Sequence, residues 1–391
     1  MKINEDRIYE DVVRAYDIFQ NGSYSKQKTF GRDIGAINYI FSKVCNKYFD
    51  FSETYNPYHD KLFTRADSKN LYDYASFVFL YMEYYMRLAK NYSDLLEKNN
   101  LTRTEPICGK VFSPAQIQEI MLDFFNEQGV DKYKIVKSMF DEERIEISKM
   151  DLDGAGAVCS VMASDIKPYI IVDAKEDRVR LYDLRDLAHE LGHAVEGHFR
   201  QNRYNKCHDG RQLILSELVS KFYEHEFCRY LQDKRIETKD ANSLINEFHV
   251  INKFFSDSLL QANPEELTME GEKYTPIEDS QRINDDKNIE IAFKKEGDDK
   301  HFYVFEFNFY KPLKYALGGI SALNLSEIKK QDPKEFNRLW DYFLSMRTLM
   351  SEEDMLDLFN MSPAELINCS YIKELIEGDV NKYNKQLKRQ L

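Results

Sequence analysis

Residues 186–199 read DLAHELGHAVEGHF, and this stretch decides how the chain is interpreted. Within it, His189 and His193 are four residues apart, so on an α-helix both imidazoles lie on one face and can reach one ion. A helix is expected here because Asp183 or Asp186 can cap it and apolar residues recur at helical spacing on another face. These apolar residues are Leu184, Leu187, Leu191 and Val195.

Glu190 directly follows the first histidine and completes a His-Glu-x-x-His pattern. In zincin-type active sites the glutamate of this pattern is the general base beside a metal-bound water. The pattern therefore predicts a Zn²⁺ site with His189 and His193 as metal ligands and Glu190 as the catalytic base. A catalytic zinc takes a third protein ligand and keeps one position open for water.

The third ligand distinguishes the classes of zinc enzyme. The metzincin pattern requires Gly at 196 and His at 199, where this chain has Glu196 and Phe199. Thermolysin-like enzymes use a downstream glutamate at a position where this chain has Gln212 and Leu213. The next acidic residue is Glu217, near the border of the buried face of a predicted helix, LILSELVSKFYEHEF. A carboxylate there is costly to bury unless it is paired or bound to metal, so Glu217 is the predicted third ligand.

These residues resemble the oligoendopeptidase F and thimet oligopeptidase family of zinc peptidases. Its members typically read TLAHELGHAMH, followed by a helix with the pattern Glu-x-x-Ser-x-x-x-Glu. This chain reads DLAHELGHAVE and has Glu217, Ser220 and Glu224 in that second pattern. Gly156-Ala157-Val158-Cys159 is similar to the family's strand before the active-site helix. Tyr315-Ala316-Leu317-Gly318 is similar to the family's Tyr-Ala-Thr-Gly segment.

The resemblance implies a zinc metalloendopeptidase that hydrolyses short or unfolded peptides. It also implies that the oxyanion formed during hydrolysis receives hydrogen bonds from a His- and Tyr-rich segment. The candidates in this chain are His301, Tyr303, Tyr310 and Tyr315. Glu224 is then expected to accept a hydrogen bond from a ligand imidazole.

Most of the remaining chain is predicted to be helical. Residues 67–97 carry apolar side chains at three-to-four spacing, and Ser113-Pro114 begins a helix that ends near Gly129. Short β-prone runs between residues 144 and 173 predict a sheet of two to four strands. A hairpin is expected around KKEGDDK, at residues 294–300.

The expected fold class is therefore mostly α with a small β-sheet beside the active-site helix. The resemblance implies a zincin-like, thermolysin-type core within an oligopeptidase-like helical architecture. We expect a helical N-terminal lobe at 1–140 and a zincin-like catalytic domain at 141–391. The polar residues 263–286 are expected to form a linker or long loop within the second domain.

The composition limits the partners and the compartment. Lys and Arg number 54 against 67 Asp and Glu, a net charge of −13, which disfavours binding to a nucleic-acid backbone. The N-terminus has no signal-peptide pattern, and the most apolar run, SFVFLYM at 76–82, is too short to span a bilayer. Six cysteines stand singly, which is typical of reduced thiols. We expect a cytoplasmic protein that binds peptides but neither nucleic acid nor membrane, although export without a cleaved signal gives the same pattern.

Two other functions fit the same residues. One is a protein-directed metalloprotease, such as an exported effector, which the short N-terminal lobe favours. The other is a non-catalytic peptide-binding relative, which the presence of both histidines, Glu190 and Glu217 disfavours. The oligomeric state and the cleavage preference have no signal in the sequence.

Overall fold

The computed structural model describes most of the chain. The described residues are 1–21, 24–45, 83–101, 109–152, 155–160, 166–174, 178–201, 217–261, 267–269, 271–277, 282–283, 288–298, 300–308, 310–346, 350 and 352–388. Of the helix predicted over 67–97, the residues before 83 lie outside this set, and 83–98 are helical.

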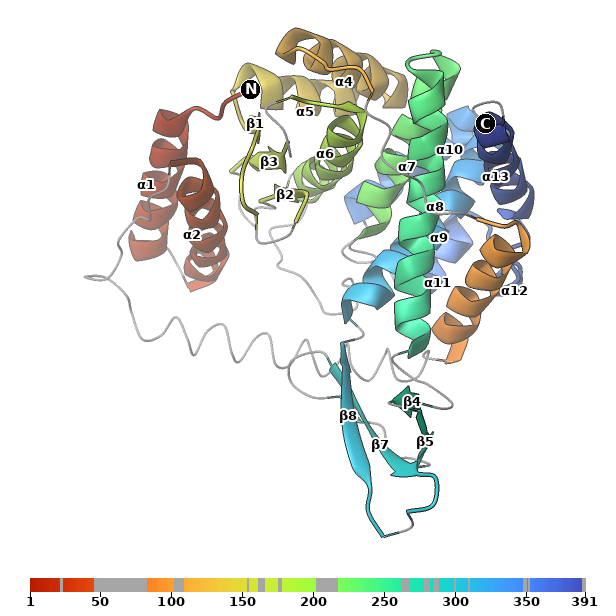
Figure 1. Ribbon diagram of the computed structural model, residues 1–391. Coiled ribbons are helices and arrows are strands. Elements are labelled where there is room, and N and C mark those ends of the chain that lie inside the picture. The colour runs from red at the N-terminus through yellow and green to blue at the C-terminus, as the bar shows by residue number, and fades with distance from the viewer. Residues whose placement is uncertain are drawn as a thin grey trace.

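The fold is mostly helical with two small sheets, as the sequence predicts (Figure 1). The helices that precede the first sheet are α1 (Glu5–Asn21), α2 (Tyr24–Cys45), the helix over 83–98, α4 (Pro114–Gln128) and α5 (Val130–Asp141). The later long helices are α6 (Leu181–Gln201), α7 (Leu218–Asp233), α8 (Thr238–Gln261), α9 (Tyr310–Gln331), α10 (Pro333–Met346) and α13 (Lys373–Lys388). Two short helices, α11 (Glu352–Leu358) and α12 (Pro363–Ile367), lie between α10 and α13. None of the helices in the described ranges has both the length and the apolar composition needed to cross a bilayer.

The α4 helix begins at the predicted Ser113-Pro114 pair and ends before Gly129. The Ser113 hydroxyl accepts a hydrogen bond from the Gln116 amide, and the Gln116 side chain accepts one from the Ser113 amide. This reciprocal cap satisfies two amides that a helix start otherwise leaves without partners.

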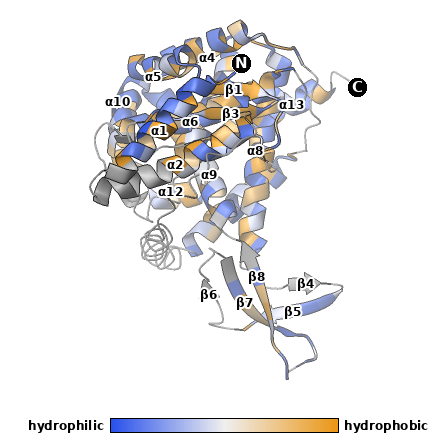
Figure 2. Cartoon of the chain, turned by 90° about the vertical axis from the view of Figure 1, so that its left-hand side faces the viewer, coloured by the Kyte–Doolittle hydropathy of each residue, from blue (hydrophilic) through white to orange (hydrophobic). Residues whose placement is uncertain are grey.

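The first sheet contains β1 (Ile145–Ser148), β2 (Ala157–Cys159) and β3 (Ile170–Asp173), in the order β1-β3-β2. The central strand β3 pairs parallel with β1 and antiparallel with β2. Alternate residues of this segment enter two cores. Ile170 and Val172 pack in the core that includes α6, and Ile171, with Tyr169 just before the strand, packs in the core that includes α1 and α2. Burial on both faces explains why this strand is almost entirely apolar, as its colour in Figure 2 shows.

The predicted N-terminal lobe, 1–140, is helical wherever the structure describes its secondary elements. Its helices contribute to two cores, and each core also includes residues after 141. Several polar contacts between the two parts are buried. In one of them, Asp11 Oδ2 accepts hydrogen bonds from Arg144 Nη1 at 2.9 Å and from the Tyr169 hydroxyl at 2.7 Å. The boundary near residue 140 therefore does not separate two independently packed cores in the described residues.

The second sheet contains β4 (Leu267–Met269), β5 (Glu272–Pro276), β6 (Arg282–Ile283), β7 (Asn288–Lys295) and β8 (Tyr303–Asn308). The predicted hairpin is the antiparallel pair β7–β8, which extends from the helical body in Figure 1. The expected loop at 263–286 needs correction, because it contains β4, β5 and β6. The side chains of β5 are exposed or half-buried and mostly polar, so this segment has no apolar alternation to indicate a strand (Figure 2).

Candidate metal centre

The α6 helix carries His189 and His193 one turn apart on one face. Asp183 Oδ2 accepts a hydrogen bond from the Arg180 amide at 2.6 Å at the start of this helix. The imidazole ring centroids are 5.1 Å apart with an interplanar angle of 81°. The four apolar residues predicted for the opposite stripe are fully buried: Leu184, Leu187, Leu191 and Val195. Core packing on that side therefore fixes the direction in which the two histidines point.

Glu217 reaches the two histidines from the start of the next helix. Its Oε2 lies 3.3 Å from Nε2 of His189 and 3.3 Å from Nε2 of His193. The ligand atoms of these three residues all lie within 4.8 Å of one another. Glu217 is the residue immediately before α7 and adopts a helical backbone there, whereas the sequence pattern placed it inside a helix. Residues 213–216 of that pattern lie outside the described part of the chain.

Two glycines allow the start of α7 to lie between α6 and α9. A Cβ atom on Gly192 would lie 2.9 Å from Ser220 Cα, and one on Gly318 would lie 2.9 Å from Glu217 Cβ. Real Cβ atoms almost never approach other atoms so closely, so these positions require glycine for the observed helix spacing. Both glycines belong to motifs identified in the sequence, HELGH and Tyr-Ala-Leu-Gly.

Glu224 holds the far side of the His189 ring. Its Oε2 lies 2.9 Å from His189 Nδ1 and accepts a hydrogen bond from Lys221 Nζ at 2.8 Å. Arg185 Nε lies 3.8 Å from the other oxygen, Oε1. With Nδ1 engaged by a carboxylate, Nε2 is the nitrogen that His189 directs toward Glu217. Metal-binding histidines commonly have this arrangement, with one ring nitrogen on a carboxylate and the other directed at the ion.

Charge coupling within the cluster is strong. Burial alone would lower the pKa of His189, but hydrogen bonds to Glu217 and Glu224 outweigh burial and raise the pKa to about 10. Burial alone would raise the pKa of Glu217, but the charge of His193 and hydrogen bonds with both imidazoles hold this pKa well below its usual range. Both shifts favour a positive charge beside the Glu217 carboxylate, and a bound cation would supply such a charge at the same atoms.

Glu190 is buried beside the two histidines, with 8% of its surface exposed. Burial raises the pKa of its carboxyl group, and the positive charges of His189 and His193 oppose that rise. A carboxylate with a raised pKa is a better proton acceptor than an ordinary surface glutamate.

Lys314 and Ser220 also contact Glu217. Lys314 Nζ donates a hydrogen bond to Oε1 at 2.8 Å, and Ser220 Oγ donates one to Oε2 at 3.0 Å. Lys314 was not predicted from the sequence, because nothing in its local sequence distinguishes it from the other lysines of its helix. Its proximity to Glu217 arises only when α9 packs against α7.

Tyr315 lies at this cluster, on α9 after Lys314. Its ring stacks on Phe255 of α8 with centroids 4.7 Å apart. Burial raises the pKa of the Tyr315 hydroxyl, with a further contribution from the charge of Glu217, so the hydroxyl stays protonated. Nζ of Lys314 and Nζ of Lys221 lie 5.0 and 5.7 Å from the centre of its ring.

Two of the other predicted oxyanion donors, His301 and Tyr303, lie elsewhere. His301 is exposed in the turn between β7 and β8, where its Nδ1 lies 3.1 Å from Asp298 Oδ2. Tyr303 begins β8, pairs with Phe293 and directs its hydroxyl toward the same aspartate. Tyr310 is the first residue of α9, and its side chain lies outside the described part of the structure. The structure thus brings Tyr315, but neither His301 nor Tyr303, into contact with Glu217.

The donor set suits a catalytic zinc ion. Two imidazole nitrogens and one carboxylate oxygen could serve as a His₂Glu ligand set, and a zinc ion held by three such ligands has a fourth position for water or substrate. The carboxylate on the far side of His189 provides the outer support that such sites use.

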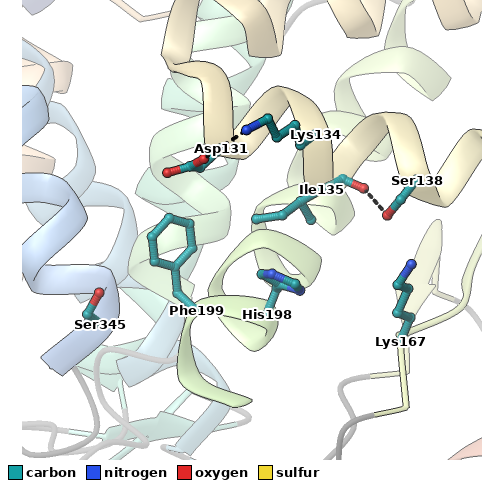
Figure 3. A pocket seen from close by; sticks show the side chains of 8 residues that line it. All are labelled: Asp131, Lys134, Ile135, Ser138, Lys167, His198, Phe199 and Ser345. Carbon is teal, nitrogen blue, oxygen red and sulfur yellow. Dashed lines mark hydrogen bonds and ion pairs between the residues drawn. The ribbon is translucent and has the colours of Figure 1, made fainter. Parts of the chain in front are cut away.

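A separate cavity of about 410 Å³ lies near the end of α6 (Figure 3). It is lined by residues of α5, α6 and α10 together with Lys167, and it includes His198, which is nine residues after His189 and so on the opposite side of α6. Both of its lysines have acidic partners: Lys134 pairs with Asp131 at 3.8 Å, and Lys167 pairs with Glu142. This neutralised lining makes the cavity a weaker candidate site than the His189–His193–Glu217 cluster.

Solved structures of three proteins align with this chain. The alignment with PZ peptidase A, in a structure with an inhibitor, has a TM-score of 0.51 and 13% identity over 80% of this chain and 59% of that protein. The alignment with a protein designated an oligoendopeptidase F, from Bacillus anthracis strain Ames, has a TM-score of 0.51 and 12% identity over 96% of this chain and 70% of that protein. The alignment with a protein designated a peptidase, from Chlamydophila abortus, has a TM-score of 0.47 and 13% identity over 96% of this chain and 63% of that protein.

No family model matches the sequence, and no curated protein matches it significantly. The chain spans between 59% and 70% of the lengths of the three structural neighbours. At 12–13% identity, the likeness is one of fold. This chain therefore has the mostly helical fold with small sheets that is found in PZ peptidase A and in the oligoendopeptidase F of Bacillus anthracis.

Proposed function

We propose that this protein is a zinc-dependent metalloendopeptidase that hydrolyses short or unfolded peptides. The observation that carries the proposal is the convergence of His189, His193 and Glu217 ligand atoms within 4.8 Å, with buried Glu190 beside them. The fold shared with two peptidase structures supports it. The resemblance of DLAHELGHAVE to the oligoendopeptidase pattern supports it independently.

His189, His193 and Glu217 would hold the metal through Nε2, Nε2 and Oε2. When bound, zinc lowers the pKa of a water molecule and polarises a peptide carbonyl. Glu190 removes a proton from the attacking water and delivers it to the leaving amine, a role that its burial and raised pKa favour. Glu224 keeps the His189 ring in one orientation throughout.

The β2 strand offers a place for the substrate backbone. It is an edge strand of the first sheet, since the order is β1-β3-β2, and it contacts α6. An extended peptide can add to such an edge through main-chain hydrogen bonds, which require no particular side chains. This mode of binding fits an enzyme that accepts unfolded peptides of varied sequence.

The experiment that tests the proposal measures zinc content and cleavage of quenched fluorescent peptides. Wild-type protein should carry one zinc ion and cleave, and Glu190→Gln should keep zinc but lose about 10²- to 10⁴-fold in rate. Glu217→Ala and His189→Ala should lose both zinc and cleavage. His198→Ala is the matched control on the same helix and should keep both. Wild-type protein without zinc, or Glu217→Ala with full zinc and activity, would overturn the proposal.

The substrate class needs a second measurement. A pool of random peptides and a set of folded proteins, each incubated with wild type and with Glu190→Gln, should show cleavage of the peptides only. Specific cleavage of one folded protein would instead indicate a protein-directed protease.

A further inference from the structure

We propose that Lys314 is a positioning residue that occupies one oxygen of Glu217, so that this glutamate offers a single oxygen to the metal. This role rests on the proposed function and adds a residue to it. The two carboxylate oxygens of Glu217 have different partners, and that difference carries the proposal.

The two oxygens of Glu217 contact different groups. Oε1 accepts a hydrogen bond from Lys314 Nζ at 2.8 Å. Oε2 lies 3.3 Å from both imidazole Nε2 atoms and accepts a hydrogen bond from Ser220 Oγ. The Glu217 side chain is 5% exposed, so water has little access to replace either partner.

The packing of α9 places Lys314 in this position. Gly318 lies against the backbone and Cβ of Glu217, and Lys314 is four residues before Gly318, on the same face of the helix. The Lys314 side chain is 20% exposed, and its ammonium group lies 5.0 Å from the centre of the Tyr315 ring. The close helix contact therefore brings the ammonium group to the carboxylate.

The consequence concerns the fourth position of the metal site. A carboxylate can bind a metal through one oxygen or through both. Binding through both oxygens would turn Oε1 from the Lys314 ammonium group toward the metal and weaken this partly buried ion pair, which is unfavourable. Lys314 thus keeps open the position that water and substrate need in a catalytic site.

Cobalt substitution tests this inference, because the visible absorption of Co²⁺ depends on its coordination number. Wild-type protein loaded with Co²⁺ should give the intense bands of a four-coordinate site. In Lys314→Met, Glu217 gains freedom to bind through both oxygens, and the bands should lose intensity. Lys314→Arg keeps the charge and should retain the wild-type spectrum. Lys311→Met removes an exposed lysine from the same helix and should also leave the spectrum unchanged.

Peptide cleavage supplies a second readout. Lys314→Met should lower kcat with little change in KM, because the ion stays bound while the water position is lost. If Lys314→Met does not fold, Lys314→Leu, which is also neutral and has no hydrogen-bond donor, is measured in its place with the same expectations.

The outcomes separate the two proposals. If wild-type protein binds no metal, the proposed function fails, and the ligand role of Glu217 fails with it. If wild type binds Co²⁺ and both Lys314→Met and Lys311→Met give its spectrum and its kcat, the proposed function stands and the role of Lys314 is overturned.

Discussion

A Cβ atom on Gly192 would lie 2.9 Å from the Cα of Ser220, so α6 and α7 are in contact at a position where only glycine fits. Gly192 directly precedes His193, and Ser220 lies in the first turn of the helix that follows Glu217. The glycine of the HELGH stretch therefore sets the distance between the two histidines and the third member of the cluster.

Substitution of Gly192 by alanine should disturb both stability and metal binding. The new methyl group meets backbone atoms of α7, which cannot rotate away, so we expect a loss of about 1–3 kcal/mol in the free energy of unfolding. Zinc affinity should fall as well, because Glu217 moves with α7. Urea unfolding and a zinc competition titration measure the two effects.

Gly378→Ala is the matched control for this substitution. Gly378 lies within α13, and a Cβ atom there would meet nothing within 4 Å. Alanine at that position should stabilise the protein by up to about 1 kcal/mol through helix propensity. Equal behaviour of the two variants would contradict the packing argument.

Glu224→Gln should weaken zinc binding without removing a metal ligand. The carboxylate on His189 Nδ1 increases the basicity of the imidazole and fixes the ring, and loss of such a partner costs about tenfold or more in metal affinity. Glu226→Gln provides the control, since Glu226 lies on the same helix and pairs with Lys329. A chelator competition assay on all three proteins gives the comparison, and unchanged affinity in Glu224→Gln would rule out the supporting role.

Zinc and protons should compete for His189. The raised pKa of about 10 means that His189 is protonated in the metal-free protein at neutral pH, and a protonated imidazole cannot bind metal. Zinc affinity should therefore rise with pH from 7 toward 10, by about tenfold per unit where one proton is displaced. Calorimetry in buffers of different ionisation enthalpy should detect about one proton released per zinc ion at pH 7. Affinity that is independent of pH over this range would mean that His189 is already neutral.

The helical part of the site could be predicted because its signals are local. Helical spacing, a cap and the His-Glu-x-x-His pattern all lie within a short stretch, and α6 forms there as expected. The strand pair β7–β8 was also predictable, since two apolar runs flank a turn-forming segment.

Contacts between distant segments could not be predicted in the same way. Lys314 lies 97 residues after Glu217, and its role depends on the packing of Gly318 against α7. His301 and Tyr303 carry chemically suitable groups, but their hairpin places them near Asp298. The strand β5 lacks apolar alternation because its side chains are largely exposed, so hydrophobic periodicity gives no strand signal.

The first turn of α6 should give the protein a measurable pH dependence of its own. Asp183 is 2% exposed, and burial raises the pKa of its carboxyl group to about 6, against the opposing hydrogen bond from the Arg180 amide. Because the folded-state pKa is above the unfolded value of 3.8, the favourable contribution of protonated Asp183 is complete below about pH 4 and is lost as the pH rises through 6. Asn keeps an oxygen that can accept the Arg180 hydrogen bond but does not ionise. The free energy of unfolding of Asp183→Asn, taken relative to wild type, should therefore rise as the pH increases from 4 to 6. Above pH 6 the difference between the two proteins should stay constant. Urea unfolding at several pH values between 4 and 8 measures this, and a difference that stays constant from pH 4 to 6 would show that Asp183 ionises in the folded protein as it does in the unfolded chain.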